Sequence, residues 1–209
     1  MRLSIQQLTS GKAFQLLHTL AYDDVVQFVF SGIKKWNVAT SLFYILNFFF
    51  LGFLIYQAYL LFTSEHIGWM FFGLCLLLGF LVLPVLLIPV HELIHAFAYR
   101  IIGAKEIRFG ASLSQFIFYV TADKFVTGYY ELIFIALLPF LLVSGLLLSL
   151  FFVFDAWISF SFLCALFAHG TMCVGDFAML SFFLENEPYD LLTFDNVDEK
   201  KSYFYKRRK

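Results

Sequence analysis

The chain has 209 residues, of which 61% are apolar, 21% aromatic and only 14% charged. This balance lies far outside the range of soluble globular domains and excludes that class. The formal net charge of −1 is uninformative by itself, but the composition predicts a membrane protein in contact with lipid, without a nucleic-acid partner.

The first element in chain order is amphipathic. Residues 1–33 mix apolar with charged positions, which favours a surface helix, and residues 1–40 are expected to form a cytoplasmic or interfacial segment. No uninterrupted apolar core follows the first basic residue, so no signal peptide is expected. Four later stretches reach the length of about 20 helical residues that crosses a hydrocarbon core. They cover residues 41–63, 68–88 with a continuation to about 102, 129–154 and 156–182.

Lys and Arg all fall on one side of this four-span arrangement. They precede the first span, lie between the second and third, and follow the fourth, whereas the links "TSEHIG" and "FDAW" contain none. Trp36, Trp69 and Trp157 fall at predicted span ends, where an amphipathic ring prefers to sit. Because basic residues are retained in cytoplasmic loops, we expect a multi-pass protein of the cell membrane with both termini in the cytoplasm.

The segment between spans two and three, "AKEIRFGASLSQFIFYVTADKFVT", differs from the spans. Its β-branched and aromatic residues predict a short hairpin of roughly 105–110 and 115–121 around a turn at "GAS". An open strand edge can bind an extended peptide; an interfacial hairpin without a substrate role is the alternative. The expected fold is an all-α integral membrane protein with about four transmembrane helices and this small cytoplasmic β-hairpin.

The membrane-embedded domain is expected over residues 41–182, followed by a charged tail over 183–209. The tail changes from acidic "ENEPYDLLTFDNVDE" to basic "KKSYFYKRRK", which indicates a solvated segment. Its last residues either contact anionic lipid or serve only to fix the topology.

The second span ends in "HELIH". His91 and His95 are spaced i and i+4, so in a helix both imidazoles can reach one metal ion, and zinc accepts such nitrogens at about 2.0–2.1 Å. Glu92 lies beside the first histidine, in the position of a general base that takes a proton from water. Pro89 favours a fresh helix start just before the histidines. A structural polar cluster is the alternative, but ionisable side chains inside spans are rare and by default functional.

A catalytic zinc usually has three protein ligands, and span four offers Asp176 and His169. Counted from the same membrane side at 1.5 Å per residue, Asp176 matches the depth of the two histidines better. His169 remains the alternative third ligand, and is otherwise expected to hydrogen-bond to a ligand, to the transition state or to a backbone carbonyl. Gly170 and Gly175 are expected to allow close approach of a neighbouring helix.

Two further groups are interpreted as structural. Cys75, Cys164 and Cys173 lie inside spans without CxxC spacing, and are expected to be small packing residues and not ligands or redox groups. Glu131, near the start of span three, is expected to be an interfacial charge and not a ligand.

The arrangement resembles intramembrane zinc proteases of the site-2 type, on the basis of HExxH, a late aspartate and a strand-rich insert between them. More narrowly, "HELIHAF", "ALLPFLL" and "GD" are similar to the bacterial zincin peptidase family known as domain of unknown function 3267, over about residues 68–182. The resemblance implies a zinc-dependent peptidase with His91 and His95 as ligands, Glu92 as catalytic base and Asp176 as the later acidic ligand. Site-2 proteases carry their aspartate just before a glycine, whereas here glycine precedes Asp176.

The leading hypothesis is an integral membrane zinc metallopeptidase with a Zn²⁺ cofactor. It would hydrolyse bonds of a peptide or membrane-protein substrate near the cytoplasmic membrane face. The alternative is a non-catalytic membrane protein whose polar cluster binds metal or a partner helix. Two imidazoles and a carboxylate suit zinc and are compatible with iron, and the sequence indicates no particular oligomeric state.

Overall fold

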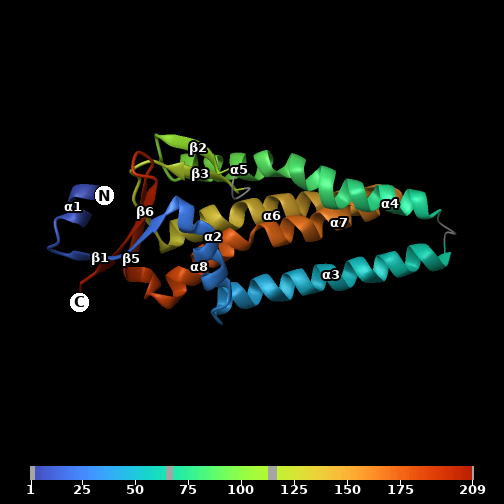
Figure 1. The fold of residues 1–209 in the computed structure, drawn as a ribbon, viewed down its shortest axis with the longest axis horizontal. Helices are drawn as coiled ribbons and strands as arrows, with labels where there is room; N and C mark the ends of the chain where they lie inside the picture. Colours follow the sequence, from blue (N-terminus) through green and yellow to red (C-terminus); the bar gives the residue numbers. More distant parts are fainter. Residues whose placement is uncertain (1–2, 65–67, 113–116, 209) are drawn as a thin grey trace. The chain divides into compact units, whose positions relative to one another are not determined.

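The computed structural model describes residues 3–64, 68–112 and 117–208. The chain divides into two compact units. The sheet unit comprises Met1–Thr40, Glu92–Leu138 and Gly175–Lys209, and the helical unit comprises Ser41–His91 and Pro139–Val174. Figure 1 shows the course of the chain through its helices and strands.

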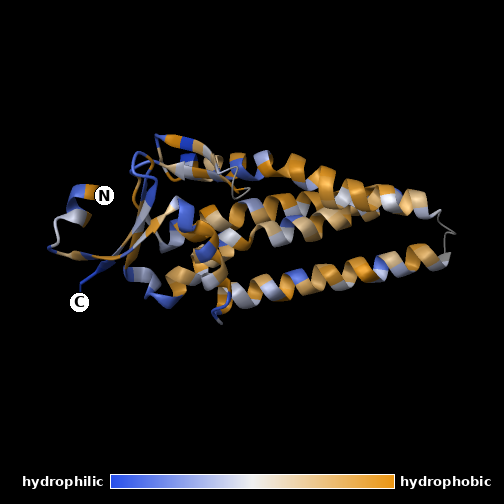
Figure 2. Cartoon of the chain, in the orientation of Figure 1, coloured by the Kyte–Doolittle hydropathy of each residue, from blue (hydrophilic) through white to orange (hydrophobic). Residues whose placement is uncertain are grey.

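Four helical runs are long and apolar enough to cross a membrane, which confirms a multi-pass membrane protein with four candidate spans. In Figure 2, which colours the ribbon by hydropathy, orange for hydrophobic residues prevails along these helices. The first run, Val38–Thr63, lies in α3 (Val38–Ser64), and the third, Tyr129–Val153, is α6 (Tyr129–Val153). The second run, Trp69–Ile101, consists of α4 (Trp69–Leu77), η2 (Leu78–Val82) and α5 (Leu83–Ile101). The fourth run, Ala156–Glu185, consists of α7 (Ala156–Met172) and α8 (Val174–Glu185).

The second run is irregular at a different place from the one predicted. Pro89 lies inside α5, so the predicted helix start at this residue is wrong. The irregular stretch is η2, a π-helical turn that ends two residues before Pro84. Proline lacks the N–H of a regular helix, and membrane helices tolerate it because neighbouring groups and local π adjustments satisfy the freed carbonyl.

Close packing of α4 and η2 against α7 forms part of the helical unit. A Cβ atom placed on Gly79 would lie 2.4 Å from Cβ of Cys164, so only glycine allows the two helices this approach. The rings of Phe72 and Phe160 stack with their centroids 5.4 Å apart. Small residues at such contacts are how membrane helices gain van der Waals packing.

The two glycines expected to permit helix approach behave differently. A Cβ on Gly170 would lie 2.9 Å from Oδ1 of Asn47 on α3, whereas a Cβ on Gly175 would have no described neighbour within 4 Å. The prediction is therefore confirmed for Gly170 and wrong for Gly175. The Asn47 amide donates to the carbonyl oxygens of Phe43 at 2.9 Å and Gly170 at 3.4 Å.

The sheet unit contains a four-stranded antiparallel sheet of order β1-β6-β5-β4. Its strands are β1 (Phe14–Ala21), β4 (Thr127–Gly128), β5 (Leu191–Asn196) and β6 (Lys201–Arg207). The all-α expectation is therefore wrong, because this sheet accompanies the helices. The single surface helix expected over residues 1–33 is found only in part: helices cover Ile5–Thr9 and Val25–Ile33, and β1 lies between them. The tail expected to be solvated supplies two strands. Strands β1 and β6 lie side by side in Figure 1.

Alternation along β6 explains why these residues form a strand with two covered faces. Phe204 is fully buried among rings that include Phe182 at 4.8 Å, from α8, and Phe28 at 6.3 Å, from α2 (Val25–Ile33). Its neighbours Tyr203 and Tyr205 stack on Phe194 of β5. They pack against a small core that includes Leu8 of α1 (Ile5–Thr9).

Two short 3-10 helices connect elements of the sheet unit. They are η1 (Tyr22–Asp24), which follows β1, and η3 (Pro188–Asp190), which precedes β5.

A second sheet consists of β2 (Ile107–Ser112) and β3 (Ile117–Ala122), which pair antiparallel close to the predicted hairpin ranges. The turn expected at "GAS" is wrong, because Gly110, Ala111 and Ser112 belong to β2. The residues joining the strands, 113–116, lie outside the described part of the chain. Gly110 is needed where it stands: a Cβ there would lie 2.3 Å from the ring of its cross-strand partner Tyr119.

Candidate metal centre

The "HELIH" residues lie on α5 without interruption. His91 and His95 are one helical turn apart and both are buried, each 8% exposed. Glu92 is partly exposed. The helix therefore presents two buried imidazoles on one face, with a more accessible carboxyl group beside the first.

In the sheet unit, His95 has a well-defined environment. Its Nδ1 lies 3.1 Å from the carbonyl oxygen of Ile135 on α6. A carbonyl can only accept, so Nδ1 must carry the proton and donate it. Its Nε2 lies 3.2 Å from Oδ1 of Asp176. In neutral His95 this nitrogen is also an acceptor, so two acceptors face each other across a distance that calls for a proton or a cation between them.

This arrangement fits a metal site. A ligating histidine usually donates its other ring N–H to a carbonyl or carboxylate, which fixes the ring orientation, and Ile135 supplies such a carbonyl. Atoms about 2.0–2.2 Å from a shared zinc ion lie little more than 3 Å apart, as Nε2 of His95 and Oδ1 of Asp176 do. Asp176 also lies in the first turn of α8, where the helix dipole favours a negative charge.

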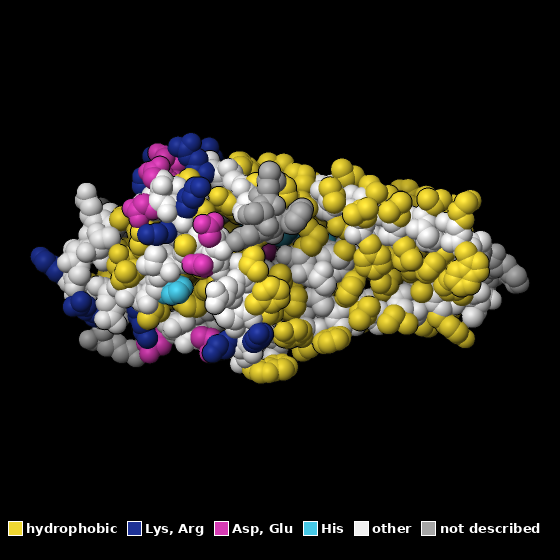
Figure 3. All heavy atoms as spheres, in the orientation of Figure 1, with side chains coloured by type: hydrophobic (Ala, Val, Ile, Leu, Met, Phe, Trp, Pro, Cys, Tyr) yellow, Lys and Arg dark blue, Asp and Glu magenta, His cyan; other side chains and the backbone are white. Residues whose placement is uncertain are grey.

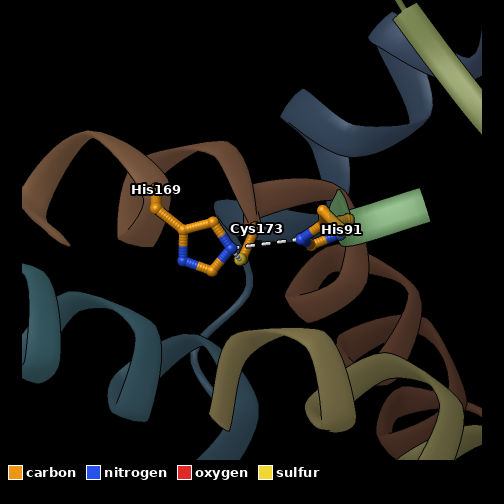
Figure 4. Close-up of side chains that lie close together, drawn as sticks. All are labelled: His91, His169 and Cys173. Atoms are coloured by element: carbon orange, nitrogen blue, oxygen red, sulfur yellow. Dashed lines mark hydrogen bonds between the residues drawn. The ribbon is translucent and has the colours of Figure 1, made fainter. Parts of the chain in front are cut away.

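In the helical unit, His91 has a different neighbour. Its Nδ1 lies 3.2 Å from Nε2 of His169, which is fully buried on α7. Sγ of Cys173 lies 3.8 Å from the same His169 nitrogen. The ligand atoms of these three buried residues are all within 4.8 Å of one another. Figure 4 shows the three side chains directed toward one another, with the His91 to His169 contact dashed.

Both candidate third ligands thus have a histidine of the motif beside them, Asp176 beside His95 and His169 beside His91. Sequence reasoning assigned Cys173 to packing, and its position beside His169 was missed. The signal was available, since His169 and Cys173 repeat the i and i+4 spacing of His91 and His95. Asp176 as the third ligand stays a prediction.

Glu131 has a local structural role. Its Oε2 accepts a hydrogen bond from the backbone N–H of Gly128 at 3.1 Å, just before α6 begins. This is half of a capping box, in which an acidic side chain satisfies an otherwise unpaired donor at a helix start.

A hollow of about 440 Å³ lies between the last turns of α5 and the start of β2. Basic and aromatic side chains line much of it, and the guanidinium of Arg100 donates to the carbonyls of Ala104 and Lys105 at its edge. The hollow therefore adjoins the helix that carries the motif, and Glu106 adds an acidic side chain to its lining. Its lining includes Phe97, Arg100, Lys105, Arg108 and Phe109.

The fold and the motif together define a helical membrane protein with metal-ligand spacing. Residues 84–190 match the family model DUF3267, described as "Putative zincin peptidase", which is more than half of the chain. The protein belongs to this family. The matched range contains both "HELIH" and Asp176, and the family description implies zinc. Neither the curated proteins nor the solved structures gave a match.

Proposed function

We propose that the protein is an integral membrane zinc metallopeptidase whose metal is held by His91, His95 and Asp176. The observation that carries the proposal is the pairing of His95 Nε2 with the Asp176 carboxylate at 3.2 Å, while Nδ1 faces the Ile135 carbonyl. His91 is included because it lies one helical turn before His95 on α5. Zinc is proposed as the metal because the chain belongs to a zincin family.

Zinc held by these three residues would polarise a scissile carbonyl and lower the pKa of a water molecule. Glu92 follows His91 on α5 and is partly exposed, so its carboxylate is accessible to a water molecule. It takes the proton of the attacking water and passes it to the leaving amine. Asp176 and His95 hold their positions through the helix start of α8 and the Ile135 carbonyl, so both ligands are preorganised.

The location is proposed to be the cytoplasmic face of the cell membrane. Strands β1 and β6 pair in one sheet, so the segments near both ends of the chain share one side. All Lys and Arg residues fall on that side of the four spans, and basic residues are retained in the cytoplasm. We further propose that the membrane-embedded domain extends from about residue 41 to about residue 182, with cytoplasmic segments before and after it.

The substrate is proposed to be an extended peptide or a segment of a membrane protein. Among the described residues β2 pairs with β3 alone, so its other edge presents backbone groups to a further strand. The hollow beside β2 and the end of α5 would take side chains of such a segment. Both features support binding of the substrate along the hairpin, from β2 toward the end of α5.

The test is replacement of Glu92 by Gln in the full chain, purified in detergent. Loss of the general base is expected to lower hydrolysis of a quenched-fluorescent peptide library by about 10²–10⁴-fold. Zinc measured by elemental analysis is expected to stay near one ion per chain, because Glu92 is not a ligand. Glu131→Gln is the matched control, since this carboxyl caps α6, and should keep both activity and zinc.

Two results would contradict the proposal. Unchanged hydrolysis in Glu92→Gln would remove its role as base. Zinc retained by both His95→Ala and Asp176→Ala would place the metal elsewhere.

A further inference from the structure

The short link between α2 and α3, residues 34–37, carries exposed basic and aromatic side chains. Lys34 and Lys35 are exposed, and neither forms an ion pair with another residue that the structure describes. Lys124 of the same unit, by contrast, pairs with an acidic side chain at 2.8 Å. Trp36 follows the two lysines and is 81% exposed. The link therefore presents two positive charges beside one large aromatic ring.

Hydrogen bonds hold the backbone of this link in place, so the exposure of Trp36 belongs to the folded structure. Oδ1 of Asn37 accepts from the backbone N–H of Ala39 at 3.1 Å and thereby caps the start of α3. The Asn37 amide donates to Oγ of Ser181 on α8 at 2.7 Å. The same Oγ donates to the carbonyl of Gly32, in the last turn of α2, at 3.0 Å. One side chain of α8 therefore holds the chain at both ends of the link.

Apolar side chains extend the exposed surface on both sides of the link. Phe30 on α2 is 62% exposed, and Val38, the first residue of α3, is 78% exposed. The first candidate span also begins at Val38, so Trp36 lies two residues outside it. Tryptophan is enriched at the boundary between hydrocarbon and headgroups, and lysines near span ends extend toward the same boundary. This position places the two ammonium groups at the level of lipid phosphates.

Trp69 offers a comparison within the chain. It begins α4, at the start of the second candidate span, and is 78% exposed. No Lys or Arg occurs in the sequence between Lys35 and Arg100. An exposed tryptophan therefore stands at two span ends, once directly after two lysines and once far from any basic residue in sequence.

We propose that an anionic phospholipid binds to an anchor surface formed by Phe30, Lys34, Lys35, Trp36 and Val38. The ammonium groups bind the headgroup phosphate, and the apolar side chains contact the upper part of the acyl chains. Glu185 places one carboxylate beside the link, where it accepts from the Asn37 amide at 3.3 Å. Two lysines against this one carboxylate leave the surface positive. One net basic charge near a membrane surface strengthens association with anionic lipid by roughly fivefold.

The experiment uses the full chain reconstituted in phosphatidylcholine vesicles in which about one lipid in ten is anionic phosphatidylglycerol. Two single-tryptophan proteins are compared. Trp69→Phe with Trp157→Phe retains Trp36, and Trp36→Phe with Trp157→Phe retains Trp69. Bromine on the acyl chains, which quenches tryptophan fluorescence at short range, is carried either by all the phosphatidylglycerol or by an equal amount of phosphatidylcholine. Both leaflets contain the brominated lipid, so the orientation of the chain does not affect the result.

We expect brominated phosphatidylglycerol to quench Trp36 roughly fivefold more strongly than the equal amount of brominated phosphatidylcholine. Trp69 is the matched control and should be quenched about equally by both. In the protein that retains Trp36, Lys34→Gln with Lys35→Gln should remove the preference, whereas Lys34→Arg with Lys35→Arg should keep it, because the charges remain. Salt at about 1 M, where the Debye length is about 3 Å, should weaken it.

Three results would overturn the proposal. The first is equal quenching of Trp36 by the two brominated lipids, and the second is a preference that persists after both lysines are replaced by Gln. The third is quenching of Trp36 by neither lipid, which would show that protein, such as a second copy of the chain, covers the surface. The first and third results need no lysine variant. Lipid binding requires neither metal nor hydrolysis, so it stands or fails separately from the proposed function.

Discussion

The helical unit and the sheet unit satisfy their polar groups in different ways. In the helical unit, side chains such as Asn47 and Ser159 donate to helix carbonyls, at 2.9 Å to Phe43 and 2.7 Å to Phe151. In the sheet unit, charged side chains pair with each other, as Lys124 does with Asp198 at 2.8 Å. Lipid offers no partners, so polar groups in spans bond locally. The contact of His91 with His169 instead joins two ionisable side chains of different spans, at 3.2 Å.

The surfaces differ in the same sense. Figure 3 shows hydrophobic side chains on the visible face of the long helices, while Lys, Arg, Asp and Glu gather over the region of the strands. Many large apolar side chains of the long helices are exposed; Phe152 on α6, for example, is 73% exposed. Large apolar side chains of the sheet unit such as Phe204 are buried in the protein, whereas many on the long helices are exposed, as expected for helices that can span a membrane. The following substitutions test this difference.

Phe204→Ala should have the largest effect. The side chain is fully buried among the rings of β1, α2 and α8, and removing such a ring costs about 3–5 kcal/mol of unfolding free energy. Phe152→Ala, at an exposed position near the end of α6, is the control and should change stability little. Thermal unfolding of both variants in one detergent checks this, and equal losses would break the distinction between the units.

Asp195→Asn tests the charges of the sheet unit. Burial, together with the nearby Asp123 carboxylate, raises the pKa of Asp195 from 3.8 to about 6, although Ser202 donates a hydrogen bond to it. The folded state therefore holds this proton more tightly than the unfolded state. The stabilisation is present below about pH 4 and is lost as the pH rises through 6, which amounts to about 3 kcal/mol at most.

The variant lacks this titration, so it should be more stable than the wild type at pH 7.5 and gain less at pH 4.5. Chemical unfolding at the two pH values measures the difference. Asp198→Asn is the control: Asp198 is exposed and its pKa is lowered by Lys124, so no gain at pH 7.5 is expected. The same pH dependence in Asp195→Asn and wild type would refute the assignment.

Gly79→Ala tests the packing inside the helical unit. The added methyl group would meet Cβ of Cys164 and the carbonyl oxygen of Ser161 at 2.4 and 2.5 Å. Neither atom is the end of a flexible side chain, and such overpacking typically costs about 1–3 kcal/mol of unfolding free energy. Gly73→Ala in the same span has no described neighbour within 4 Å of the new carbon and should be neutral or slightly stabilising, because alanine favours the helix. A thermal-stability ranking that reverses these two variants would contradict the packing of η2 on α7.

The spans could be predicted because their signal is local: about 20 consecutive apolar residues suffice. The pairing of β1 with β6 was not predicted, since the two strands are about 180 residues apart in sequence. The alternation in "KSYFYKR" was a local strand signal, but the surrounding charges suggested a solvated tail. In β1, "FQLLHTLA" contains apolar spacings that also suit an amphipathic helix, and tertiary pairing decided the outcome.

The candidate site was predictable to the extent that it depends on spacing. The motif predicted His91 and His95 as ligands, and depth along span four favoured Asp176 over His169; Asp176 lies beside His95 and His169 beside His91. The Ile135 carbonyl that orients His95 carries no side-chain signal, so no sequence pattern could reveal it. Cys173 could have been found from its spacing to His169, but an isolated cysteine in an apolar span is ordinarily a packing residue.

The pairing of β1 with β6 also sets an order of events during synthesis. At about 5–20 residues per second, the ribosome needs roughly 10–40 s to make the chain between these strands. All four candidate spans are translated in that interval, during which β1 cannot pair because β6 has not yet been made. The unit that contains Glu92 and Asp176 can therefore close only after the last strand emerges. A nascent chain stalled before Lys201 would carry the whole "HELIH" helix without a completed sheet.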